Sequence, residues 1–138
     1  MLKTLFTHLL FRDDDVLILD MYAGVEHLGR ATVDFVDAMI IVVEPTRRSL
    51  GTARQIKKLA EDIGLTQLAL VGNKTRDEED VAFLEENTPG IPLLGVLPVD
   101  LRVQEADRKG IPVYDHVPAL HTAAQQIAEK LKETIKSV

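Results

Sequence analysis

The chain has 138 residues, of which 46% are hydrophobic and 28% charged, so it is expected to be one soluble globular domain, residues 1–138. Its formal net charge of −6 argues against a nucleic-acid-binding surface. The absence of cysteine excludes disulfides and thiolate metal sites and fits a cytoplasmic location. No apolar run approaches the roughly 18–20 residues of a membrane span, so no membrane interaction is expected.

Apolar runs and segments of helical spacing alternate along the chain. The first twelve residues carry apolar side chains at helical spacing, and an acidic triplet at residues 13–15 separates them from the first apolar run. The apolar runs predict four strands, at residues 16–20, 38–43, 67–71 and 93–97. The other segments predict helices at residues 1–12, 25–36, 49–63, 77–87, 100–110 and 119–137.

The four runs are continuously apolar, which is typical of strands buried on both faces of a parallel sheet. The alternation therefore predicts an α/β fold, in which a parallel sheet of about four strands is covered by helices on both faces. The carboxyl ends of such strands meet at one edge, where α/β proteins bind ligands. Polar clusters follow all four strands: Asp20 to Gly24, Glu44 to Ser49, Asn73 with Lys74, and Pro98 to Asp100.

Residue types and spacing alone leave structural explanations open for these clusters. Asp20 and Gly24 fit a buried strand followed by a polar loop as well as they fit a ligand site. Asn73 suits a turn after Gly72, and Lys74 suits a solvated charge. His116 and His121 have no metal-ligand spacing with other side chains and are interpreted as structural.

A longer motif is more specific. Asp20-Met-Tyr-Ala-Gly-Val-Glu-His-Leu-Gly-Arg30 resembles the second nucleotide-switch motif of the carbon monoxide dehydrogenase maturation ATPases, in the MinD/ParA-like branch of P-loop proteins. The resemblance covers essentially all of the chain, but only the C-terminal half of such a protein. It continues through Val42-Val-Glu-Pro-Thr-Arg-Arg-Ser49, Gly72-Asn-Lys74, Gly95-Val-Leu-Pro-Val-Asp100 and Ala106-Asp-Arg-Lys-Gly110.

This resemblance implies a role for most of the polar clusters. Asp20 would hold Mg²⁺ through water, and the N–H of Gly24 would lie near the γ-phosphate, so both would form a catalytic switch. Asn73 and Lys74 would recognise the adenine of ATP or ADP, because an Asn side chain both donates and accepts hydrogen bonds. The loop of Pro98, Val99 and Asp100 would form the other wall of the base pocket.

The resemblance also implies partners. Family members act in nickel insertion into carbon monoxide dehydrogenase, so that enzyme is the implied client, and a homodimer is expected. Glu26, His27 and Arg30 would serve the dimer interface or a partner. Considered without the resemblance, they form an exposed helix face with an i, i+4 charge pair.

Two family features are absent from this sequence. It contains no Gly-x-x-x-x-Gly-Lys-[Ser/Thr] phosphate loop, and it lacks the Cys-x-Cys pair that many family members carry. Because that loop and its lysine position and neutralise the β/γ-phosphates, the chain alone is not expected to hydrolyse ATP.

Two other classes of function remain open. One is a non-catalytic MinD/ParA-like interaction module that has lost its nucleotide. The second is a flavodoxin-like binding or receiver domain, which is disfavoured because only Asp20 and Lys74 are placed as a receiver requires.

The absent phosphate-loop strand has a consequence for the sheet. In the resembling family, that strand lies between the strands that match residues 16–20 and 38–43. Its absence leaves an open apolar edge, which is a pairing hazard. Residues 16–20 would then pair directly with residues 38–43, or a second copy would cover the edge, and a homodimer or larger assembly is expected.

Overall fold

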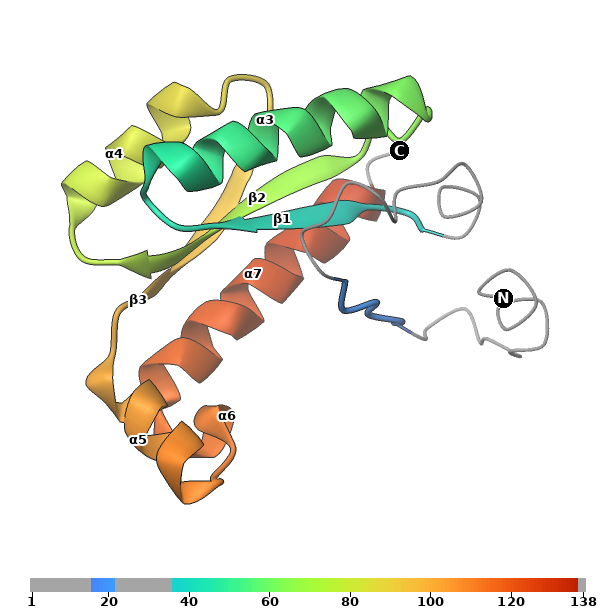
Figure 1. The fold of residues 1–138 in the computed structure, drawn as a ribbon. Helices are drawn as coiled ribbons and strands as arrows, with labels where there is room; N and C mark the ends of the chain where they lie inside the picture. The colour runs from blue at the N-terminus through green and yellow to red at the C-terminus, as the bar shows by residue number, and fades with distance from the viewer. Residues whose placement is uncertain (1–15, 22–35, 137–138) are drawn as a thin grey trace.

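The computed structural model describes residues 16–21 and 36–136, and the statements below concern those residues. Most of the predicted elements are confirmed, with ends within a few residues (Figure 1). The helix predicted at residues 1–12, and all but the last residue of the one predicted at 25–36, lie outside the described residues. The described elements are β1 (Met39–Val43), α3 (Arg47–Asp62), β2 (Leu68–Thr75), α4 (Glu78–Asn87), β3 (Leu93–Pro98), α5 (Leu101–Lys109), α6 (Val113–His116) and α7 (Pro118–Lys136).

The three described strands form a parallel sheet in the order β1-β2-β3. Helices α3 and α4 lie over one face, and α7 runs along the other, as Figure 1 shows. The predicted α/β architecture, with a parallel sheet between helices, is thus confirmed. Among the described residues, no helix is long and apolar enough to cross a membrane.

The core has two parts because successive side chains of a strand point to opposite faces of the sheet. On the α3 side, Ile41 and Val43 of β1 pack with Leu50 of α3, Leu70 of β2 and Leu84 of α4. On the α7 side, a smaller cluster gathers around β2, β3 and α7: Ala69, Val71, Leu94 and Ile127. Both faces of β2 are therefore buried, as its apolar sequence predicts.

The strand predicted at residues 16–20 is not present. Residues 16–21 have no regular secondary structure, and Ile18 is 84% exposed. Of the two alternatives given for the sheet edge, direct pairing of residues 16–20 with residues 38–43 is therefore wrong, and the described part of the sheet has three strands rather than four. The apolar run has strong strand propensity, but a strand forms only where a neighbour accepts its backbone hydrogen bonds.

The helix ends follow from local side chains. Thr46, Asp77 and Asp100 are the N-caps of α3, α4 and α5, and each side chain accepts a hydrogen bond from a backbone N–H in the first turn. Gly110 ends α5 in the left-handed conformation, with φ of 63°. The four-residue helix α6 lies between the helices predicted at residues 100–110 and 119–137, where the sequence predicted no regular element.

Candidate functional site

Three of the predicted polar clusters meet at the carboxyl edge of the sheet. The Nζ of Lys74, near the end of β2, lies 2.5 Å from Oε1 of Glu44, which directly follows β1. On the other side, the N–H of Val99 donates to the carbonyl oxygen of Thr75 over 2.9 Å. The ends of β1, β2 and β3 are therefore joined through three residues of the predicted clusters, Glu44, Lys74 and Val99, together with Thr75, which was not among them.

Asn73 and Lys74 lie within β2 rather than after it, which corrects the prediction that the strand ends at residue 71. Asn73 pairs with Leu97 and Thr75 with Pro98, so Lys74 is the extra residue of a β-bulge. Its φ is 57°, the left-handed region that non-glycine residues rarely adopt. Its N–H donates to Oδ1 of Asn73 over 3.0 Å. The bulge thus redirects the Lys74 side chain at the strand end.

The ion pair between Lys74 and Glu44 contributes little to folding. The two side chains are 62% and 45% exposed, and exposed pairs stabilise proteins by about 0–1 kcal/mol. A left-handed non-glycine residue costs about 1–2 kcal/mol. Because the cost exceeds the gain, stability alone does not explain a lysine at this position. Backbone strain of this kind is concentrated at functional sites, so the bulge is a candidate for a binding position.

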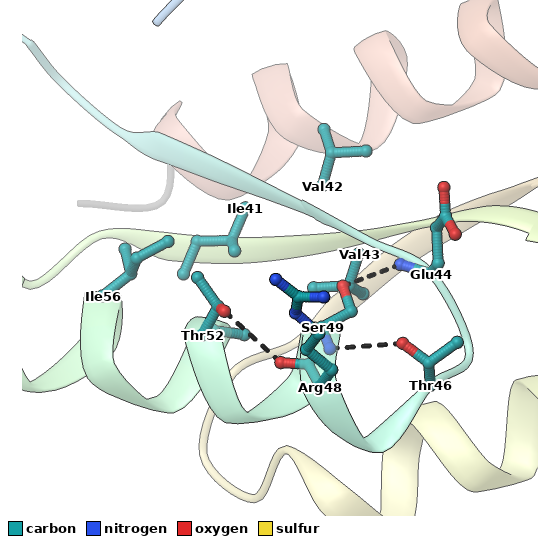
Figure 2. A pocket seen from close by; sticks show the side chains of 10 residues that line it. Ile41, Val42, Val43, Glu44, Thr46, Arg48, Ser49, Thr52 and Ile56 are labelled. Carbon is teal, nitrogen blue, oxygen red and sulfur yellow. Dashed lines mark hydrogen bonds between the residues drawn. The ribbon is translucent and has the colours of Figure 1, made fainter. Parts of the chain in front are cut away.

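A shallow hollow of about 290 Å³ lies beside β1, at the start of α3 (Figure 2). Its polar rim is ordered by two hydrogen bonds: the N–H of Glu44 donates to Oγ of Ser49 over 3.0 Å, and the N–H of Ser49 donates to Oγ1 of Thr46 over 3.2 Å. Arg48 also lines the hollow and makes no ion pair with another described residue. The rest of the lining is mainly apolar: Ile41, Val42, Val43, Ala53 and Ile56.

Asp100, the last residue of the predicted base-pocket wall, is held by Arg102. The Arg102 guanidinium donates to both carboxylate oxygens of Asp100, at 2.5 to 3.1 Å, and its backbone N–H donates over 2.9 Å. These bonds, with a smaller contribution from the charge of His116, lower the pKa of Asp100 to about 2. The loop after β3 therefore carries a carboxylate that stays ionised far below neutral pH.

We expect Asp100→Asn to reduce stability at pH 7 but not at low pH. In the unfolded chain an aspartate has a pKa of about 3.9. Because the pKa of Asp100 is lower in the folded chain, its ionised form stabilises the protein at pH values above about 4. This stabilisation is lost as the pH falls from about 4 towards about 2. Urea unfolding at pH 7, 4 and 3 measures the difference between wild type and variant. Asn retains the helix cap, and Arg102→Gln should give the same pH dependence. A constant difference would contradict the assignment.

Several contacts here were not predicted from the sequence. Besides Glu44 with Lys74, the guanidinium of Arg76 binds both oxygens of Asp80, a buried carboxylate, and lowers its pKa. His116 is half-buried, and its Nε2 lies 3.6 Å from Oε2 of Glu105. Among these pairs, only Arg76 and Asp80 have a sequence spacing, i and i+4, that could have predicted their contact. The other pairs depend on how elements distant in sequence pack.

Of the remaining predicted residues, the structure describes only Asp20. Asp20 is described, but it is exposed and outside any regular element. Gly24, Glu26, His27 and Arg30 lie outside the described residues. No group of three or more metal-ligating side chains occurs within residues 16–21 and 36–136. An oxygen ligand such as Asp20 suits Mg²⁺, but the other ligands would have to be water and phosphate oxygens.

Comparisons with known proteins identify relatives of this chain. No family model matches the chain. It is 38% identical over 135 residues to the carbon monoxide dehydrogenase accessory protein CooC of Rhodospirillum rubrum, covering 98% of this chain and 51% of that protein. An uncharacterised ATP-binding protein of Methanocaldococcus jannaschii is 43% identical over 115 residues, covering 82% of this chain and 45% of the relative. The septum site-determining protein MinD of Synechocystis is 32% identical over 134 residues, covering 86% and 47%.

The parallel sheet with helices on both faces, together with these relatives, defines the chain as part of an α/β domain of the P-loop NTPase-like class. It spans about half the length of the curated relatives that it matches. Within that class the chain is a homologue of CooC, with MinD and ATP-binding proteins as further homologues.

Proposed function

We propose that this chain is the base-binding and switch portion of an ATP-binding protein for carbon monoxide dehydrogenase maturation, corresponding to the C-terminal half of such a protein. One observation carries the proposal. The strained bulge at Asn73 and Lys74 lies at the same sheet edge as the loop from Pro98 to Asp100. A hydrogen bond from the N–H of Val99 to the carbonyl oxygen of Thr75 joins the two segments. The names of the relatives, one an ATP-binding protein and one an accessory protein of that dehydrogenase, support the ligand and the client.

The side chains at this edge suit a purine. The amide nitrogen of Asn73 makes no hydrogen bond with a described residue, so it can donate to a ring nitrogen of the base, while Oδ1 still has a second lone pair. The aliphatic part of Lys74 can cover the ring while its ammonium group stays in water. Val99 is about half exposed and offers an apolar surface on the opposite side.

The proposal assigns the switch to Asp20 and Gly24. When Mg²⁺ and a triphosphate are bound, the metal would neutralise phosphate charge, and Asp20 would hold it through water. The N–H of Gly24 would contact the γ-phosphate. Glu26, His27 and Arg30 would contact a partner. Nickel insertion into the dehydrogenase, a cytoplasmic location and action as a homodimer complete the proposal.

We expect the chain alone to bind adenine nucleotides weakly and not to hydrolyse ATP, because its sequence has no phosphate loop to bind the β/γ-phosphates. Isothermal titration with ATP and Mg²⁺, with and without Asn73→Ala, measures the binding. The variant should lose it, whereas Gln55→Ala, an exposed change in α3, should leave it intact. Turnover, sub-micromolar binding, or equal binding by the Asn73 variant would contradict the proposal.

A further inference from the structure

The lysine of the bulge is restrained by a residue of the neighbouring strand end. A lysine side chain has a flexible four-carbon stem, and when exposed it samples many rotamers. The Lys74 side chain is 62% exposed, yet its Nζ lies 2.5 Å from Oε1 of Glu44. Among the described residues, no other carboxylate makes an ion pair with this lysine. In the described part of the chain, Glu44 is therefore the residue that holds the ammonium group.

The backbone of Glu44 is itself fixed at both of its polar groups. Its N–H donates to Oγ of Ser49 over 3.0 Å, and its carbonyl oxygen accepts from the N–H of Thr46 over 2.7 Å. Pro45 follows directly and disfavours helical backbone angles at Glu44. Figure 2 shows that the carboxylate points away from Ser49 and Thr46. The turn into α3 thus anchors the glutamate while its side chain reaches towards β2.

The other end of the lysine side chain is also fixed. The N–H of Lys74 donates to Oδ1 of Asn73, and the next residue, Thr75, is 3% exposed and accepts from the N–H of Val99. The Cα of Lys74 is therefore held by the bulge, and the ammonium group is held by Glu44. A stem fixed at both ends has few rotamers left.

The strand order sets the direction in which the stem is drawn. Because β2 lies between β1 and β3, Glu44 and the loop from Pro98 to Asp100 lie on opposite sides of Lys74. The ion pair draws the ammonium group towards β1, away from that loop. The methylene groups remain over the end of β2, and these are the part of a lysine that packs on a flat ring.

We infer that Glu44 is a positioning residue for the base site, acting through Lys74. The inference rests on the proposed function, in which the stem of Lys74 covers the base. Ordering this stem before the ligand arrives removes an entropy cost from the binding step. The restraint also keeps the ammonium group on a carboxylate, so the lysine serves the base rather than the phosphates. Glu44 thereby favours recognition of the base over general attraction of anions.

The first test compares adenosine with ATP in NMR titrations of the chain. Glu44→Gln keeps the side-chain length but removes its charge, and it should raise the dissociation constant for adenosine about three- to tenfold. The constant for ATP should rise less, because the released ammonium group can approach the phosphates. Glu61→Gln, which breaks an exposed ion pair with Lys57 in α3, should change neither constant. Unchanged adenosine binding, or equal losses for both ligands, would overturn the inference.

The second test asks whether Glu44 acts through the lysine. Lys74→Met retains an unbranched stem but has no ammonium group for the glutamate to hold. Adding Glu44→Gln to this variant should therefore have no further effect on adenosine binding. A further loss as large as in the wild type would show that Glu44 acts on the ligand or on the fold directly, and would overturn the positioning role.

Two further measurements separate failure of this inference from failure of the proposed function. If Asn73→Ala and Lys74→Ala lose adenosine binding while Glu44→Gln does not, the base site stands and the role of Glu44 is wrong. If the wild type and both alanine variants bind adenosine equally, or none binds it, the proposed function is wrong and the role of Glu44 falls with it. NMR relaxation of the Lys74 Cε group needs no ligand: Glu44→Gln should lower its order parameter, and an unchanged value would overturn the restraint.

Discussion

Gly95→Ala should destabilise the chain by about 1–3 kcal/mol, whereas Gly51→Ala should stabilise it by about 0.5–1 kcal/mol. A Cβ at Gly95 would lie 2.7 Å from Cγ1 of Ile127, where α7 packs on β3. Ile127 is buried, and its Cγ1 is not a free side-chain end, so either helix or strand must shift. At Gly51, inside α3, nothing lies within 4 Å of the added methyl group, and alanine favours the helix.

Urea denaturation of the two variants and the wild type measures both effects under one set of conditions. The opposite signs serve as the control, because each variant adds the same methyl group. The Gly95 variant with Ile127→Val should recover part of the lost stability, since the shorter side chain makes room. If Gly95→Ala were neutral, α7 would not be packed against β3 as described.

Asp20→Ala should lower kcat on the order of a hundredfold in a protein that joins this chain to a phosphate-binding half. This expectation rests on the proposed role of Asp20 in holding Mg²⁺. A contact through the metal strengthens as charge develops in the transition state, so hydrolysis should suffer more than ATP binding.

The measurement is steady-state hydrolysis and ATP affinity for the joined protein and its variant. Asp107→Ala, an exposed aspartate on α5, is the matched control and should change neither quantity. Equal losses in affinity and kcat, or no loss in either, would remove Asp20 from the switch.

The fold was largely predictable because its signals are local. Continuous apolar runs marked β1, β2 and β3, and helical spacing with polar caps such as Thr46 and Asp77 marked α3 and α4. The run at residues 16–20 carries an equally strong local signal and yet is not a strand. An apolar run with strand propensity therefore forms a strand only when a neighbouring strand is available to pair with it. The spacing of residues in the sequence does not show whether such a neighbour is present.

The sequence predicted which residues of the candidate site lie at the sheet edge, but it did not predict which of them contact one another. The clusters at Glu44, Asn73 and Pro98 to Asp100 do meet at one edge, as parallel strands require. The bulge at Lys74 was not foreseen, because Asn-Lys after a glycine is equally consistent with a turn outside the strand. The bond between Lys74 and Glu44 joins residues thirty positions apart, so it follows only from the register of β1 and β2.

If Lys74 contacts the base as proposed, its strained backbone lowers stability at the same position where its side chain is needed for binding. Glycine would adopt the left-handed conformation without strain, but it would remove the ammonium group and the stem to which the proposed function assigns contact with the base. Substitutions that relax this position therefore improve folding at the expense of the side chain, a trade-off between stability and activity. A programme that ranks variants by melting temperature alone would select against the residue. Stabilising changes are better made at sites such as Gly51, where no binding group is lost.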